Sequence, residues 1–283
     1  MNRLLYATDF HGAQDALEAL FQRAKEDKPD LIILGGDLAP MPGQDIDASP
    51  AEQREFYLNY FAEILQRWRD SRGCPVWAIP GNDDWASTFE SSILNLQDKG
   101  LIGSLLHQDV CLGNWVIMGF PWVPVTPFFM SDYDRIDYTG WEPQIYPEWT
   151  AFSNKISDSI VQGSWSEFLN RPTIAEELEE LTRHTDKSRL VLVAHTPPWG
   201  CGLDLMGNGA FVGSEALTQW ITRHQPALTL HGHIHEAPWV SGTMTANIDR
   251  TLSINPGASC WGLRAVTLES DNSGQWKIVR GID

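Results

Sequence analysis

The first hundred residues alternate between short apolar runs and longer segments with helical spacing. Three runs are mostly apolar and each ends in polar residues: 3–9, 31–38 and 75–82. Between and after them, apolar side chains recur three and four positions apart, as on one face of a helix, at residues 13–27, 49–70 and 86–100. This alternation of strand and helix favours parallel βαβ units with right-handed crossovers.

After residue 100 the pattern becomes less regular. Residues 110–120 (VCLGNWVIMGF) predict a β-hairpin, because a Gly-Asn pair separates two apolar runs. Residues 120–170 follow neither period and are rich in proline and aromatic residues, which flexible segments lack. We therefore expect an ordered insertion there. It would form either a lid or substrate rim, or a hydrophobic cover over a sheet edge.

The second half of the chain returns to alternation. Helical spacing recurs at residues 173–184 and 213–224. Apolar runs that predict strands lie at residues 189–198, 227–236, 251–255, 265–269 and 275–280. The whole pattern favours one α/β domain over residues 1–283, in which two β-sheets are flanked by helices and the insertion spans about residues 120–170.

Composition narrows the class of protein. Of the 283 residues, 42% are hydrophobic and 20% are charged, which is typical of a globular protein. The sequence contains no uninterrupted run of 18 apolar residues, the length needed to span a membrane. The first twelve residues are too short and too polar for a secretory signal, so we expect a cytoplasmic protein. The four cysteines form no C-x-x-C pair and are expected to be reduced thiols: Cys74, Cys111, Cys201 and Cys260.

The formal net charge is −17, from 37 acidic and 20 basic residues. Such a chain repels polyanions, which disfavours a nucleic-acid polymer as partner. A small anionic substrate stays compatible with this charge if metal ions supply positive charge locally.

Polar side chains directly follow five of the expected strands. They form the motifs Asp9-Phe10-His11, Gly36-Asp37, Gly81-Asn82, Ala194-His195 and Gly232-His233-Ile234-His235. Ligands of open α/β sheets bind at the carboxyl ends of strands, so we expect these residues to converge. Their side chains offer nitrogen and oxygen atoms that suit a divalent metal, and none offers sulfur. Each motif alone is commonly a turn or a core histidine, and only the ordered set indicates a metal site.

The spacing within these motifs has a simple geometric interpretation. Residues i and i+2 of an extended segment point the same way, so we expect Asp9 and His11 to share a site, and likewise His233 and His235. Glycines precede Asp37 and two other motif residues, and we expect them to permit sharp turns that bring the side chains close.

The ordered set D-x-H, G-D, G-N, H and G-H-x-H resembles the calcineurin-like metallophosphoesterase superfamily. Matching segments run from Asp9 to His235, and SINPGAS (253–259) is similar to the closing strand and turn of that family. The resemblance implies a four-layer α/β/β/α sandwich of two mixed β-sheets with a dinuclear metal centre. By position, Asp9, His11 and His235 would hold the first ion. Asn82, His195 and His233 would hold the second, and Asp37 would bridge both.

The resemblance also implies the chemistry. Two divalent ions would generate a bridging hydroxide, which would attack the phosphorus atom of a phosphate ester in line with the leaving group. A phosphodiester is the favoured ester. Manganese, iron, zinc, cobalt or nickel all accept such a ligand set. A small or medium phosphate ester is the expected substrate, and a nucleotide is compatible with the aromatic insertion. The alternative is a catalytically weakened member of the family that acts as a protein-binding scaffold.

Three further residues are candidates for catalysis: Asp83, Asp84 and His231. Asp83 stands where many family members have a histidine that is credited with protonating the leaving group. We expect this carboxyl, beside two cations, to be ionised and a poor proton donor, so activated aryl diesters should react faster than alkyl monoesters. His231 shares a strand face with His233 and is a candidate donor, with a core histidine as the alternative. Asp84 is expected to orient Asn82 or a neighbouring loop through hydrogen bonds.

Overall fold

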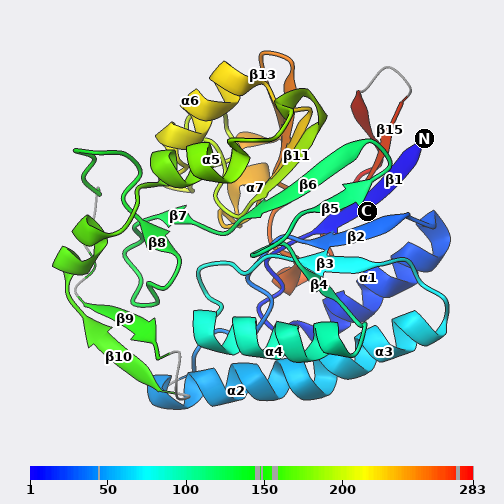
Figure 1. The fold of residues 1–283 in the computed structure, drawn as a ribbon, viewed down its shortest axis with the longest axis horizontal. Helices are drawn as coiled ribbons and strands as arrows, with labels where there is room; N and C mark the ends of the chain where they lie inside the picture. The colour runs from blue at the N-terminus through cyan, green and yellow to red at the C-terminus, as the bar shows by residue number, and fades with distance from the viewer. Residues whose placement is uncertain (44, 144–146, 148, 155–158, 272–274, 283) are drawn as a thin grey trace.

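The computed structural model describes residues 1–43, 45–143, 147, 149–154, 159–271 and 275–282. Two six-stranded β-sheets pack against each other, and helices cover the outer face of each, which gives four layers in the order α/β/β/α (Figure 1). The fold class expected from the sequence is confirmed. Within the described residues, no helix has both the length and the apolar character needed to cross a bilayer.

The first sheet is built from both ends of the chain. Its strand order is β16-β15-β1-β2-β3-β4, with bounds Trp276–Arg280, Ala265–Ser270, Asn2–Ala7, Leu31–Leu34, Val76–Ala78 and Gly103–Ser104. Strands β1 to β4 are parallel to one another, whereas β15 pairs antiparallel with β1 and β16 antiparallel with β15. The parallel units expected for the first hundred residues are therefore present, and β4 is a further strand that the pattern did not indicate.

Helices cover the first sheet where the spacing predicted them. Their bounds are Gln14–Asp27 for α1, Ser49–Phe56 for α2, Ala62–Asp70 for α3 and Ala86–Asp98 for α4. A short 3₁₀ turn, η1 (Ile46–Ala48), leads into α2. Helices α2 and α3 are joined by the π-helical turn η2 (Tyr57–Phe61), so the segment expected to form one helix has a local change of pitch.

The second sheet has the order β13-β14-β12-β11-β6-β5. The bounds of these strands are Thr245–Ile248, Thr251–Ile254, Leu228–Leu230, Leu190–Ala194, Trp115–Phe120 and Val110–Leu112. Strands β5 and β6 form the expected hairpin. Helices α5 (Ile174–Thr182) and α6 (Glu215–His224) pack on this sheet. Helix α7 (Ala237–Ser241) and the 3₁₀ turn η4 (Lys187–Arg189) complete this half. The 3₁₀ turn η5 (Ser259–Trp261) instead donates backbone hydrogen bonds to Thr8 and Asp9, which follow β1.

The hydrophobic core lies in three layers, and strand β1 shows how one segment serves two of them. Leu4 and Tyr6 lie in the core between the two sheets, whereas Leu5 and Ala7 pack against the helices of the first sheet. All four side chains are fully buried. A strand buried on both faces needs a continuous apolar run, which explains why the strands were visible in the sequence.

Residues 120–170 contain short elements of their own. These are β7 (Val123–Pro124), β8 (Asp134–Arg135), β9 (Thr150–Ser153), β10 (Ile160–Gly163) and η3 (Trp165–Asn170). Val125, Ile136, Phe152 and Phe168 form a small apolar cluster within the segment. Residues 144–146, 148 and 155–158 of the expected insertion lie outside the described residues. The interpretation as a single domain with an insertion stays a prediction.

Candidate metal centre

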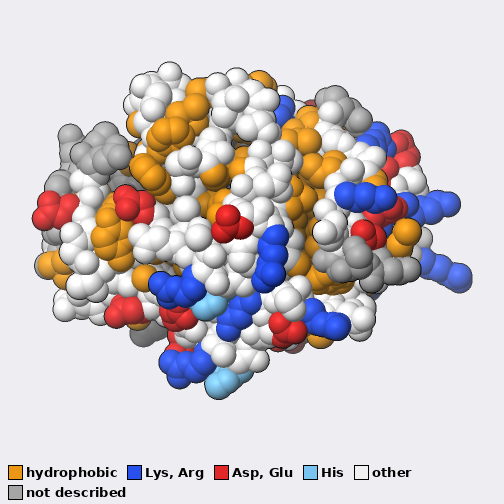
Figure 2. Space-filling view, turned by 90° about the horizontal axis from the view of Figure 1, so that it is seen from above, with side chains coloured by type: hydrophobic (Ala, Val, Ile, Leu, Met, Phe, Trp, Pro, Cys, Tyr) orange, Lys and Arg blue, Asp and Glu red, His pale blue; other side chains and the backbone are white. Residues whose placement is uncertain are grey.

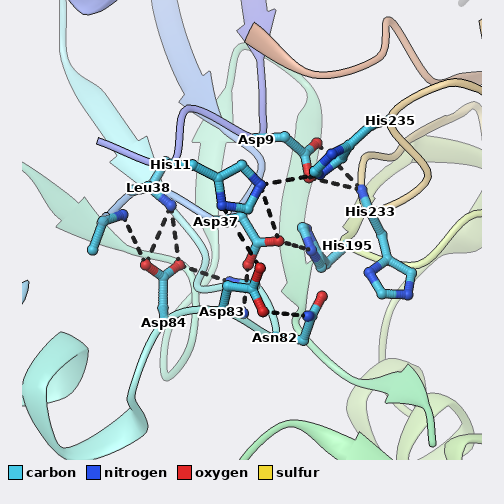
Figure 3. Close-up of polar contacts among 12 residues, drawn as sticks. Asp9, His11, Asp37, Leu38, Asn82, Asp83, Asp84, His195, His233 and His235 are labelled. Atoms are coloured by element: carbon cyan, nitrogen blue, oxygen red, sulfur yellow. Dashed lines mark hydrogen bonds and ion pairs between the residues drawn. The ribbon is translucent and has the colours of Figure 1, made fainter. Parts of the chain in front are cut away.

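The polar residues at the strand ends come together in space although they are scattered over more than 200 positions of the chain (Figure 3). The loops after β1, β2 and β3 contribute Asp9, His11, Asp37 and Asn82, and the loops after β11 and β12 contribute His195, His233 and His235. Both sheets therefore supply side chains to one site.

A first group contains Asp9, His11, Asp37 and His235, whose ligand atoms lie within 4.8 Å of one another. The Nε2 atoms of His11 and His235 are 3.0 Å apart, and His235 Nε2 lies 3.3 Å from Asp9 Oδ1. Asp9 also accepts a hydrogen bond from the backbone N–H of His233. These contacts fix the carboxylate and both imidazoles around one point.

A second group contains Asp37, His195 and His233, again within 4.8 Å. His195 Nε2 lies 3.2 Å from Asp37 Oδ2, while its Nδ1 lies 2.8 Å from the carbonyl oxygen of Gly35. The Gly35 contact sets the orientation of the ring, as a second hydrogen bond commonly does for metal-ligating histidines. Asp37 belongs to both groups and is the shared member.

One unpaired atom of the site fits a metal centre. The Oδ1 atom of Asn82 is buried without a hydrogen-bond partner, although buried polar atoms are normally paired. Asn82 donates from Nδ2 to Asp83 Oδ1 over 2.9 Å, which leaves its carbonyl oxygen free. Imidazole, carboxylate and amide groups in this arrangement are suitable ligands for divalent transition metals.

The backbone of the site is strained. Four residues of the site have positive φ angles: Asp9 (55°), His11 (45°), Asp37 (51°) and His233 (66°). These angles lie in the left-handed region, which residues other than glycine rarely adopt. Such strain is characteristic of functional sites. It also corrects our geometric interpretation, because Asp9 and His11 do not project from an extended segment; two left-handed residues turn them toward the same point.

Of the three glycines in the motifs, one acts as expected and two act differently. Gly36 has a φ of 104° and makes the sharp turn that we predicted. At Gly81 and Gly232 no positive φ is found, but an added Cβ atom would collide with the side chains of Asp37 and Asp9, respectively. Glycine at these two positions permits close approach to the carboxylates.

The charges of the site are tuned by its own members. Burial by itself raises the pKa of the Asp37 carboxyl, but His195 and His11 lower the pKa below its ordinary value. Burial by itself lowers the pKa of His195, but the Asp37 carboxylate raises the pKa to about 10. Burial lowers the pKa of His233 to about 3. Asp37 and His195 thus stabilise each other's charged forms, whereas burial favours the neutral form of His233.

Asp83 lies at the edge of this centre. Its backbone N–H donates to Asp37 Oδ1 over 2.7 Å, and its Oδ2 atom lies 3.7 Å from His11 Nδ1. Burial, together with the carboxylates of Asp37 and Asp84, raises the pKa of Asp83 well above its ordinary value. The protein groups therefore act on Asp83 in the direction opposite to the one that we expected from neighbouring cations.

Asp84 is fully buried and faces the loop after β2. Its carboxylate accepts hydrogen bonds from the backbone N–H groups of Leu38, Ala39 and Gly81, and from the Tyr57 hydroxyl over 2.7 Å. Burial and the Asp37 carboxylate raise the pKa of Asp84 to about 6. Asp84 does not contact Asn82 through these bonds; it ties the loop that carries Asp37 to the loop that carries Asn82.

His231 lies in the core. Its Nδ1 atom is 3.0 Å from the carbonyl oxygen of Ala194 and 2.9 Å from that of Thr196, and its Nε2 atom is 2.7 Å from Thr229 Oγ1. Burial lowers the pKa of the ring to about 4. Both nitrogens are occupied by structural partners, so the placement favours the core histidine over the proton donor.

A cavity of about 480 Å³ adjoins the centre and is lined in part by Asp37, Asn82, His233 and His235. Its lining also includes residues 124–130 and Trp141 of the segment for which a substrate rim was one of two expectations. Trp199 and Phe211 line it too, and sequence reasoning did not identify them, because they lie in loops without periodicity.

Comparison with known proteins gives the family. The model of the family described as "Calcineurin-like phosphoesterase" matches residues 3–237. A protein of Synechococcus sp. that is described as a probable cyclic nucleotide phosphodiesterase is 26% identical over 220 residues, which cover 77% of this chain and 63% of that relative. The match thus spans less than two thirds of the relative's length.

Solved structures share the fold over nearly the whole chain. A protein of Thermus thermophilus matches with a TM-score of 0.56 at 15% identity, over 98% of this chain and 97% of that one. A dimetal phosphatase from Danio rerio matches with a TM-score of 0.55 at 12% identity, over 94% and 92%. At these identities the two structures show a common fold.

Proposed function

Because the chain belongs to the calcineurin-like phosphoesterase family, whose members depend on metal ions, we propose that it hydrolyses a phosphodiester at the centre described above. The observation that carries this proposal is the pair of ligand groups that share Asp37. Two groups with a common carboxylate suit two cations held close together, the arrangement used for in-line displacement at phosphorus.

The proposed ligands follow the geometry. Asp9, His11 and His235 would hold one ion. Asn82, His195 and His233 would hold the other, and Asp37 would serve both. When bound, divalent cations of this kind lower the pKa of water and stabilise negative charge on the phosphoryl group. The nitrogen-rich ligand set suits manganese, iron, zinc, cobalt or nickel.

Residues around the ligands hold them in place. The Gly35 carbonyl orients the His195 ring. The Asp83 side chain accepts a hydrogen bond from Asn82 Nδ2, which leaves Asn82 Oδ1 available as a ligand. Asp84 fixes the two loops that carry Asp37 and Asn82. Preorganisation of this kind means that little rearrangement is needed when substrate and metal bind.

The leaving group is expected to depart without a histidine as proton donor. Asp83 replaces the histidine of other family members, and no histidine outside the proposed ligand set is among the described residues that line the cavity. An ester whose leaving group is a stable anion needs no such donor. We therefore propose a preference for activated aryl diesters over alkyl monoesters.

The proposed substrate is a small or medium diester. A nucleotide-containing diester is one candidate, in line with the description of the Synechococcus relative. The net charge of −17 disfavours a nucleic-acid polymer.

The test is hydrolysis by purified protein that has been loaded with each of the five metals in turn. Bis(p-nitrophenyl) phosphate and cyclic nucleotides should be cleaved, alkyl monoesters should be cleaved much more slowly, and Asp37→Asn should abolish cleavage. Equal rates on aryl diesters and alkyl monoesters would contradict the proposed preference. A protein that retains no metal and tolerates Asp37→Asn without loss of any property would instead support the scaffold alternative.

A further inference from the structure

The cavity beside the metal centre has two walls that come from different parts of the chain. Residues 124–130 together with Trp141 form the first wall. The second wall consists of Trp199, Met206, Asn208 and residues 210–213. The proposed ligands Asp37, Asn82, His233 and His235 lie at the same cavity, so a phosphate at the metal centre would place its organic group between these walls.

Both walls carry aromatic rings that remain accessible to solvent. Phe128 of the first wall is 57% exposed, and Trp199 of the second wall is 42% exposed. The rings of Trp199 and Phe211 contact each other edge to face, with centroids 5.9 Å apart. Aromatic surface left open beside a catalytic centre is characteristic of a site that binds another apolar or aromatic group.

The charge of the cavity restricts which group can bind. No lysine or arginine is found among the described residues that line it, whereas Glu215 and Glu236 are. On the face shown in Figure 2, basic side chains lie at the right-hand end, near the centre and along the lower edge, and none of the described ones is seen at the far left. A substrate group with its own negative charge would meet like charge here without compensation.

The walls are held in place without a ligand. Asp132 of the segment that follows the first wall accepts backbone hydrogen bonds from Ala86 at the start of α4 and from Ser153 of β9, at 2.9 and 3.0 Å. At the second wall, Asp204 accepts from the backbone N–H groups of Gly200 and Gly213, at 2.9 and 3.1 Å. Walls fixed in this way lose little conformational entropy when a rigid group binds between them.

From these observations we propose that the cavity binds an uncharged, ring-bearing group of the substrate, an aryl group or a nucleobase, and selects against groups that carry a negative charge. This proposal rests on the proposed function for the position of the phosphate. The rings of Phe128, Trp199 and Phe211 contact the bound ring, and Glu215 and Glu236 repel anionic groups.

Binding of phosphonates by the metal-loaded protein tests the proposal independently of turnover, because their carbon–phosphorus bond is not cleaved. In isothermal titration calorimetry, phenylphosphonate should bind at least tenfold more tightly than methylphosphonate. The charged analogue 4-carboxyphenylphosphonate should lose most of this gain. An adenosine 5′-phosphonate that binds a further tenfold more tightly would identify a nucleobase as the ring, and equal affinity would identify a simple aryl group.

Variants locate the effect in the walls. Trp199→Ala and Phe128→Ala should each reduce the preference for phenyl over methyl at least threefold, while the affinity for methylphosphonate and the metal content stay unchanged. Leu94→Ala, which removes an exposed apolar side chain of α4, is the matched control and should leave the preference intact.

The outcomes separate this proposal from the proposed function. Equal affinity for phenyl- and methylphosphonate, absence of binding by phenylphosphonate at millimolar concentration, undiminished binding of the carboxyphenyl analogue, or an unchanged preference in both wall variants would each overturn it. If no phosphodiester is hydrolysed with any metal but the preference for the ring is found, the proposed function fails and the ring site stands.

Discussion

The metal centre and the walls of the adjoining cavity are both built around buried aspartates, but the electrostatics of the two regions are opposite. In the centre, burial alone would raise the pKa values of Asp9 and Asp37, and neighbouring histidines lower them instead. In and around the walls, burial raises the pKa of four carboxyls: Asp132, Asp134, Asp137 and Asp204. The pKa is about 8 for Asp134 and about 6 for Asp137.

The difference shows that one residue type performs two tasks. A carboxylate that faces imidazoles keeps its charge and can bind a cation. A carboxyl that faces backbone N–H groups holds a loop by hydrogen bonds, as Asp134 does when it accepts from the N–H of Thr126 over 3.1 Å. Removing charge should therefore abolish function in the centre and be tolerated in the walls.

The largest effect is expected from Asp37→Asn. The amide removes the negative charge shared by both ligand groups, so hydrolysis of bis(p-nitrophenyl) phosphate should fall by about a thousandfold or more, which corresponds to about 4 kcal/mol at 1.36 kcal/mol per decade. Metal content, measured by elemental analysis, should fall as well. Asp134→Asn is the matched control: it makes the same change from carboxyl to amide at another fully buried aspartate and should change the rate less than about threefold.

A smaller loss is expected from Asp84→Asn. In the native protein, backbone N–H groups donate to both carboxylate oxygens of Asp84; in the variant, an amide NH₂ group would replace one of these oxygens and could not accept. The loops that carry Asp37 and Asn82 would then lose hydrogen bonds that join them. Loss of a group that supports metal ligands costs about 10- to 100-fold in metal affinity or activity. Metal affinity and kcat should fall together. Tyr57→Phe removes one hydrogen bond of the same carboxylate and should have a weaker effect. Unchanged metal affinity in Asp84→Asn would contradict the anchoring role.

Asp83→His sharpens the comparison at the edge of the centre. An imidazole can donate a proton near neutral pH, and general acid catalysis contributes about 10²- to 10⁴-fold where it operates fully. We expect the rate on an alkyl phosphate ester to rise about tenfold relative to the rate on an activated aryl diester. A ratio that does not change would show that the residue at position 83 does not set the preference for leaving groups.

The smallest effect on activity, and a distinct effect on stability, is expected from Asp134→Asn. The pKa of Asp134 is about 8 in the folded protein and near 4 when unfolded, so unfolding releases a proton between these values. The unfolding free energy should therefore fall as pH rises from about 4 to about 8, by an amount on the order of a few kcal/mol. In urea titrations at pH 5 and pH 7.5, Asp134→Asn should reduce this fall. An identical fall in both proteins would show that Asp134 is not protonated in the folded state.

Much of the fold could be predicted because its strands are buried on both faces. The runs at β1, β2 and β11 are continuously apolar and were visible without long-range information. Strand β4, with only two residues, and strand β13, which is not fully buried, gave no such signal. Their pairing depends on neighbours that are distant in the chain.

At the candidate site, the motifs predicted which residues meet but not how they meet. The left-handed backbone at Asp9 and His11 is not encoded by residue type alone, and the extended geometry that we assumed for them is wrong. For His231, the spacing to His233 indicated a shared face, whereas the fold surrounds its ring with backbone carbonyls at the end of strand β11 and in the loop that follows it.

The amino-acid sequence by itself determined the alternation of strands and helices and the set of polar side chains at the strand ends, because both depend on local periodicity and on residue chemistry. The tertiary structure alone decided the left-handed backbone that turns Asp9 and His11 toward one point, and the position of Phe128 and Trp199 at the same cavity. Such convergence depends on packing between segments far apart in the chain, and local patterns carry no record of those distances.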